Sequence, residues 1–167
     1  MLCVGKILNM EVVSTTKKID TNSKISTNTT SDRLFEVIVI EDNHLTNTIL
    51  SRALESTIKS IHNLKNISVN FLSFHNGSDY LSYLESKNFD SLKLIVFSDY
   101  HLEDNMDGGE ILKNTKQKKA DASVIIMSDS ANEQIWLEAV KNGAYCFLPK
   151  SNKIPVVCSE LLFQMVI

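Results

Sequence analysis

The sequence contains few of the residues that are typical of disulfide-rich proteins or of proteins with structural zinc sites. Its 167 residues include three cysteines, two prolines and five glycines. The cysteines Cys3, Cys146 and Cys158 are widely spaced, and no two of them form a C-x-x-C pair. Neither a disulfide framework nor a structural zinc site is therefore predicted.

The sequence also has no large excess of charge of one sign and no long apolar run. The 17 basic residues stand against 20 acidic ones, for a net charge of −3, which gives little support to binding of nucleic acid through its phosphates. No run approaches the roughly 20 apolar residues that cross a bilayer, and the opening MLCVGKILNMEVV has no signal-peptide pattern. We expect a cytoplasmic protein with neither membrane nor nucleic-acid partners.

The two ends of the chain differ in composition. In the stretch 14–32, twelve of nineteen residues are Ser, Thr or Asn, and such a segment buries too little apolar surface to offset its ordering entropy. We predict a flexible N-terminal extension over residues 1–33 and one folded domain over residues 34–167.

The folded part alternates between two periodicities. Apolar runs predict strands at Val37–Ile40, Ile67–Phe71, Leu94–Phe97, Val124–Met127 and Tyr145–Leu148. Helical spacing predicts helices over Leu45–Ile58, around Tyr80–Leu84, and over Gly109–Gln117, Ala131–Lys141 and Ile154–Ile167. Such alternation predicts an α/β fold, a flavodoxin-like doubly wound parallel sheet with strand order 2-1-3-4-5.

Polar residues follow the predicted strands where each one ends. Glu41 and Asp42 follow the first strand, Asp99 the third, Ser128 the fourth and Lys150 the fifth. In a sheet of this order these ends meet at one crevice. Crowded carboxylates favour a hard divalent cation such as Mg²⁺, and a central carboxylate can attack phosphorus to give an acyl phosphate.

This set of residues resembles the receiver domains of response regulators, which act in two-component signalling, from about Leu34 to the C-terminus. The matching segments are Ile40–Asn43, Asp99–Leu102, Ser128 and Gly143–Lys150. The resemblance implies that Asp99 is the phosphoacceptor. It also implies Mg²⁺ ligation by Asp42, Asp99, the main-chain carbonyl of His101 and, through a water, Glu41; phosphoryl contacts from Ser128 and Lys150; and a switch aromatic at Phe147.

By that resemblance, we expect a stand-alone receiver that takes a phosphoryl group from a histidine kinase or a histidine phosphotransfer protein. It would modify only itself and would not be an enzyme with an external substrate. Two alternatives stay open: a phosphorylation-independent pseudo-receiver, and a small phosphatase or hydrolase that uses Asp99 as nucleophile.

An output face is expected on the last two helices. We predict that Ile154, Val157, Cys158, Leu161, Leu162 and Met165 form the buried stripe of the final helix. Trp136, Val156 and Phe163 are left for a homodimer or partner face, made of the fourth helix, fifth strand and fifth helix. The alternative is that Trp136 and Phe163 only cap the core.

Two departures from the family pattern lie close to the expected site. Receiver domains often carry proline four residues after the phosphoacceptor, where this chain has Glu103 in an acidic loop. The residue after the hydroxyl position is usually small, and here it is Asp129. Neither departure removes a group that the chemistry requires.

Overall fold

A computed structural model describes residues 34–104, 106–130 and 132–167 of the chain. The extension predicted over residues 1–33 lies outside them. Five parallel strands form one sheet in the order β2-β1-β3-β4-β5, so the predicted fold class and strand order are confirmed. The strands are β1 (Leu34–Ile40), β2 (Val69–Phe74), β3 (Leu92–Asp99), β4 (Ser123–Ser128) and β5 (Cys146–Pro149).

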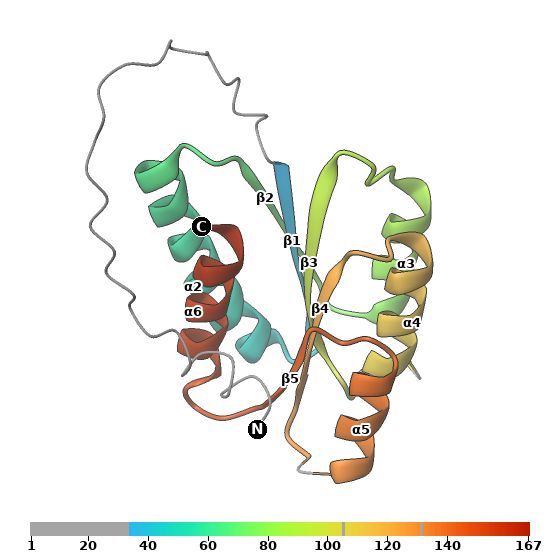
Figure 1. Cartoon of the computed structure of the whole chain (residues 1–167). Coiled ribbons are helices and arrows are strands. Elements are labelled where there is room, and N and C mark those ends of the chain that lie inside the picture. Colours follow the sequence, from blue (N-terminus) through green and yellow to red (C-terminus); the bar gives the residue numbers. More distant parts are fainter. Residues whose placement is uncertain (1–33, 105, 131) are drawn as a thin grey trace, which may run out of the picture. The chain divides into compact units, whose positions relative to one another are not determined.

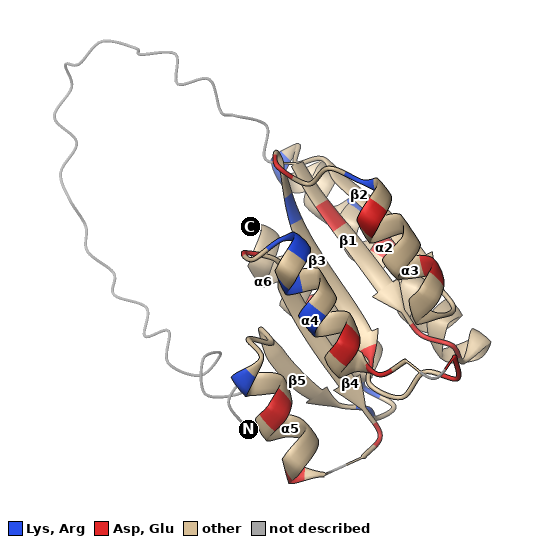
Figure 2. Ribbon diagram, turned by 90° about the vertical axis from the view of Figure 1, so that its right-hand side faces the viewer, with Lys and Arg blue, Asp and Glu red and all other residues tan. Residues whose placement is uncertain are grey.

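Helices cover both faces of this sheet. They are α2 (His44–Lys65), α3 (Gly77–Ser86), α4 (Gly108–Lys118), α5 (Glu133–Lys141) and α6 (Ile154–Val166). In Figure 1, α2 and α6 pack together on one face, and α3, α4 and α5 lie on the other. Figure 2 looks onto the second face, where basic and acidic residues both appear on the helices. Within the described residues, no helix has the length and apolar character of a membrane span.

Burial explains the strand patterns. Phe35 to Ile40 of β1 are buried without alternation, because this central strand is covered on both faces. The sheet edge is formed by β2, where Asn70 and Ser73 are exposed between half-buried apolar residues. The predicted edge position of this strand is therefore confirmed, although the strand begins at Val69 and not at Ile67.

Two helix details differ from the sequence-based expectation, the start of α5 and the extent of the buried face of α2. The helix predicted from Ala131 begins at Glu133, because the Asn132 side chain accepts the Gln134 N–H and caps the helix there. On α2, Leu45 and Ile49 are 69% and 48% exposed. Leu50 and Leu54, which belong to the same predicted stripe, are buried, and the buried face of that helix also includes Ile61 and the polar residue Asn47.

The buried stripe of α6 is shifted from the predicted one. Val157 is 36% exposed and Met165 is half-buried, while Val166 is buried. Ile154, Cys158, Leu161 and Leu162 are buried as predicted. Since α6 packs against α2, the face turned toward α2 helps to decide which of the many apolar residues are covered.

Candidate functional site

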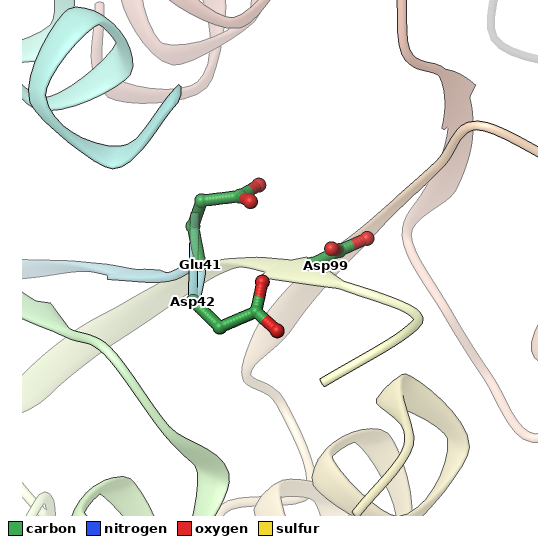
Figure 3. A group of neighbouring side chains, drawn as sticks. All are labelled: Glu41, Asp42 and Asp99. Atoms are coloured by element: carbon green, nitrogen blue, oxygen red, sulfur yellow. The ribbon is translucent and has the colours of Figure 1, made fainter. Parts of the chain in front are cut away.

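Three carboxylates meet where β1 and β3 end. Glu41 and Asp42 follow β1, and Asp99 is the last residue of the neighbouring strand β3. One oxygen of each side chain lies within 4.8 Å of the others, and Figure 3 shows the three groups from adjacent strand ends. Glu41 is fully buried, Asp99 is 5% exposed, and Asp42 is half-buried. The sequence-based expectation that these carboxylates share one crevice agrees with this geometry.

Lys150 completes the cluster from the end of β5. Its Nζ lies 2.7 Å from Glu41 Oε2 and 2.7 Å from Asp99 Oδ2. Its backbone N–H donates to the carbonyl of Ser128 on the adjacent strand β4, at 2.8 Å. One ammonium group is thus shared between two buried carboxylates.

The electrostatics of the cluster follow from that sharing. Burial raises the pKa of Asp99, and hydrogen bonds from Lys150 and from the His101 and Tyr100 backbone only partly offset it. Burial and the nearby Asp99 charge raise the pKa of Glu41 in the same way, against the effect of Lys150. Burial disfavours the ammonium of Lys150, yet its bonds to both carboxylates outweigh this and raise its pKa.

The residues present fit a hard divalent cation. Carboxylate oxygens are the ligands that Mg²⁺ takes in proteins, and here one oxygen from each of three carboxylates lies within 4.8 Å of the others, while the Lys150 ammonium pairs with Glu41 and Asp99. Burial raises the pKa of Glu41 and of Asp99 more than Lys150 lowers it, and a bound cation would favour the ionised form of both groups. The cluster therefore has both the donor atoms and the electrostatic need for such an ion.

The other predicted site residues surround this cluster. Ser128, the last residue of β4, is buried, and its Oγ accepts the N–H of Ser130 at 3.1 Å. Phe147 is half-buried on β5 and packs against the main hydrophobic core. The His101 side chain is exposed and touches Tyr100 edge-on. Asp129 is exposed, directly after Ser128.

The predicted interface residues lie apart from the cluster. Val156 and Phe163 on α6 are 58% and 36% exposed. Trp136 on α5 is half-buried. The part of α5 near Trp136 also exposes Leu137 and Val140, so apolar surface on the last two helices is not confined to the residues predicted from the sequence.

The sequence-based prediction did not include Asn47, a buried amide that binds the backbone next to the site. Asn47 Nδ2 donates to the carbonyl of Glu41 at 2.8 Å and to that of Phe74 at 3.1 Å. Its Oδ1 accepts from the Ser73 and Ser51 hydroxyls at 2.7 and 3.1 Å. The signal was an asparagine in helical phase with Leu50 and Leu54, at a position where an apolar residue is expected.

Comparisons with known proteins agree with this architecture. A family model described as "Response regulator receiver domain" matches residues 37–161. No curated protein sequence matches the chain. Among solved structures, the BeF3-activated DrrB receiver domain has 19% sequence identity and a TM-score of 0.59, with 80% of this chain and 94% of that chain covered.

Two further solved structures show the same likeness of fold. The response regulator domain of Thermotoga maritima CheB has 21% identity and a TM-score of 0.56, with coverage of 80% of this chain and 94% of that one. A response regulator protein from Burkholderia pseudomallei, solved with a phosphorylated aspartic acid, calcium ion and citrate, has 23% identity and a TM-score of 0.55. That match covers 80% of this chain and 73% of that one.

Proposed function

This chain belongs to the family of response regulator receiver domains, and from that premise we propose that Asp99 accepts a phosphoryl group from a phosphohistidine donor in a Mg²⁺-dependent reaction. The observation that carries the proposal is the buried Asp99 carboxylate, 2.7 Å from the Lys150 ammonium and grouped with Glu41 and Asp42. Phosphorylation of an aspartate is general in the family. The donor would be a histidine kinase or a histidine phosphotransfer protein.

In the proposed reaction an oxygen of Asp99 attacks phosphorus, the new O–P bond forms, and the P–N bond to the donor imidazole breaks. The imidazole leaves neutral when its other ring nitrogen carries a proton. Lys150 would stabilise negative charge on the phosphoryl oxygens, and Ser128 would donate its hydroxyl to them. Both residues stand at strand ends beside Asp99.

We assign the metal to Asp42, Asp99 and the main-chain carbonyl of His101, with Glu41 acting through a water. Bound there, Mg²⁺ would neutralise charge on the transferring phosphoryl group. Burial supports the division of roles, since the fully buried Glu41 is paired with Lys150 while Asp42 is half-buried.

The proposed output is a change in the surface formed by α5, β5 and α6. Phosphorylation adds negative charge beside Ser128, and movement of this residue would leave room for Phe147 to turn inward. Phe147 is half-buried on β5, between α5 and α6 along the chain. Trp136, Val156 and Phe163 would then contact a second copy or an output protein.

The test is incubation with acetyl phosphate, with and without Mg²⁺, followed by mass spectrometry of peptides. We expect one Mg²⁺-dependent phosphoryl group per chain, on Asp99, and its loss in Asp99→Asn. The exposed Asp90→Asn is the matched control and should be labelled like the wild type. Wild-type labelling of Asp99→Asn at another residue would refute the assignment. A wild type that takes no label would favour the pseudo-receiver, and rapid hydrolysis of an external phosphomonoester such as p-nitrophenyl phosphate would favour the hydrolase.

A further inference from the structure

The loop between β3 and α4 is fastened to the start of α3. Asp104 Oδ2 accepts two hydrogen bonds from Ser78, one from its N–H and one from its hydroxyl, each 2.9 Å long. Met106 packs on Gly77, the residue before Ser78, since a Cβ added to Gly77 would lie 2.8 Å from the Met106 sulfur. Polar and apolar contacts thus hold the same stretch of loop against one helix end.

The same loop also reaches the carboxylate cluster. The backbone N–H of Glu103 donates to Asp42 Oδ2 at 2.9 Å. Asp42 is half-buried, so its side chain needs such a bond to hold one direction. Proline, common at the position of Glu103 in receiver domains, has no N–H to give. The contact is therefore a property of this chain's acidic loop.

The two contacts stand on adjacent residues. When the Asp104 carboxylate is bound to Ser78, the peptide group before it has little freedom, and that peptide carries the Glu103 N–H. Asp104 also lies at a helix N-terminus, where negative charge is favourable. Although burial alone would raise the pKa of Asp104, the hydrogen bonds from Ser78 lower it and keep the carboxylate ionised.

We propose that Asp104 is a positioning residue for the metal site: its bonds to Ser78 hold the Glu103 N–H against Asp42 and so aim the Asp42 carboxylate at the cation. This inference rests on the proposed function of Asp42. The N–H occupies one lone pair of Oδ2, which leaves the rest of the carboxylate for the metal. Hydrogen bonds that orient a ligating group commonly change metal affinity by about 10–100-fold. Asp104 acts one residue further away, so a smaller effect is expected.

The experiment compares Asp104→Ala with Asp104→Asn in the full chain. Both changes remove the same charge, but the Asn side chain keeps an oxygen that can accept from Ser78. By calorimetric titration with Mg²⁺, we expect Asp104→Ala to bind about three- to tenfold more weakly than the wild type. Asp104→Asn should remain within about twofold of the wild type. Glu103→Gln keeps its backbone N–H and controls for the loss of a loop charge.

A second measurement needs no metal. In protein with EDTA, hydrogen exchange at the Glu103 amide should be faster in Asp104→Ala than in Asp104→Asn or the wild type, because the N–H is released from Asp42. Ser78→Ala, which removes one of the two bonds to Asp104, should fall between them. It also keeps the test open if Asp104→Ala fails to fold.

The possible outcomes distinguish a failure of the role proposed for Asp104 from a failure of the proposed function. A wild type that does not bind Mg²⁺ would refute the proposed function, and the inference with it. A wild type that binds Mg²⁺, together with equal affinities in Asp104→Ala and Asp104→Asn, would refute the inference alone. Tighter binding by Asp104→Ala would also overturn it, since the loop would then be holding Asp42 away from the metal.

Discussion

Two buried glutamates of the β1 segment have opposite surroundings. Glu36 lies within β1 at 1% exposure, and Glu41 follows the strand at 0% exposure. Glu36 accepts from Asn70 Nδ2 at 2.9 Å and from the Tyr83 hydroxyl at 2.7 Å, and it forms an ion pair with Lys87. Three donors therefore converge on one carboxylate.

At Glu41 the number of donors for each carboxylate is much smaller. It shares the single ammonium of Lys150 with Asp99, and its other oxygen accepts the Asn43 N–H at 3.3 Å. The pKa values of the two glutamates shift in opposite directions because their numbers of donors differ. Burial raises the pKa of Glu36, but its three partners outweigh burial and bring it below the usual value. Burial raises the pKa of Glu41, and its partners do not compensate.

The comparison shows that burial alone does not decide in which direction the pKa of a carboxylate shifts. The number of donors for each carboxylate separates a group whose bonding is complete from one that still needs a cation. On this view the Glu36 cluster (Glu36, Asn70, Tyr83 and Lys87) is structural. The Glu41 cluster (Glu41, Asp42, Asp99 and Lys150) is the one that we propose binds the cation and reacts.

The largest expected contrast is in metal binding. Asp42→Ala should abolish Mg²⁺ binding measurable by calorimetry, because a methyl group cannot replace a ligating carboxylate. Glu36→Gln, which removes one negative charge from the other cluster, should bind Mg²⁺ like the wild type. Trp136 fluorescence offers a second readout. Equal losses in the two variants would mean that overall charge, and not the Glu41 cluster, attracts the ion.

The second contrast is in the free energy of unfolding, measured with urea in EDTA. Glu36→Gln should lose about 2–3 kcal/mol, since it leaves the partly buried Lys87 without its partner and a carboxamide among donors. Asp99→Asn makes the same change of acid to amide where carboxylates are crowded, and should stay within about 1 kcal/mol of the wild type. Similar losses at both positions would remove the distinction between the clusters.

A smaller effect is expected at the solvent side of the Glu41 cluster. The exposed Asp129 follows Ser128. Its side chain would narrow the approach of water, and its charge would add to that of an anionic acyl phosphate at Asp99. Asp129→Ala should therefore speed loss of the phosphoryl group by roughly five- to thirtyfold, equivalent to about 1–2 kcal/mol. Decay of purified phosphoprotein in Mg²⁺ buffer measures this. Slower decay would instead identify Asp129 as a base that orients water.

The smallest effect is the pH dependence of stability, and the two clusters should differ in its sign. A lowered pKa means that Glu36 stabilises the fold above about pH 4–5, where an ordinary glutamate titrates, and that this stability is lost as the pH falls through its folded-state pKa. The raised pKa of Asp99 favours the fold at acid pH, and that contribution is lost as the pH rises through the raised value.

Urea unfolding in EDTA at pH 3.5 and pH 7 tests both signs. From pH 7 to 3.5, Glu36→Gln should lose less stability than the wild type, and Asp99→Asn should lose more. Asp90→Asn is the control for an exposed carboxylate and should follow the wild type. Deviations from the wild-type loss that have the same sign in Glu36→Gln and Asp99→Asn would contradict the comparison.

The sequence predicted the parts of the fold that depend on local pattern. Runs such as Leu94–Phe97 and Val124–Met127 lie in β3 and β4, because a strand covered on both faces needs apolar residues throughout. Helix faces were less predictable. Leu45 and Ile49 satisfy the spacing of an apolar stripe, yet they are exposed, since several apolar faces were available and packing used another.

The candidate site divides in the same way. Each of its carboxylates stands directly after or at the end of a strand, so strand prediction and sheet order were enough to bring Glu41, Asp42 and Asp99 together. Asn47, which binds the carbonyls at the ends of β1 and β2, was missed. Its bonds to Glu41, Phe74 and Ser73 depend on where α2 lies over the sheet.

The sequence by itself determined the strands, their order and which acids follow them, because periodicity and parallel pairing are local or topological properties. Only the tertiary structure decided which carboxylate has enough hydrogen-bond donors. Glu36 finds its donors 34, 47 and 51 residues away along the chain, and Asp42 meets the Glu103 N–H across 61 residues. Such hydrogen bonds require donor and acceptor to be placed within about 3 Å by packed helices and loops, and no spacing along the chain encodes that distance.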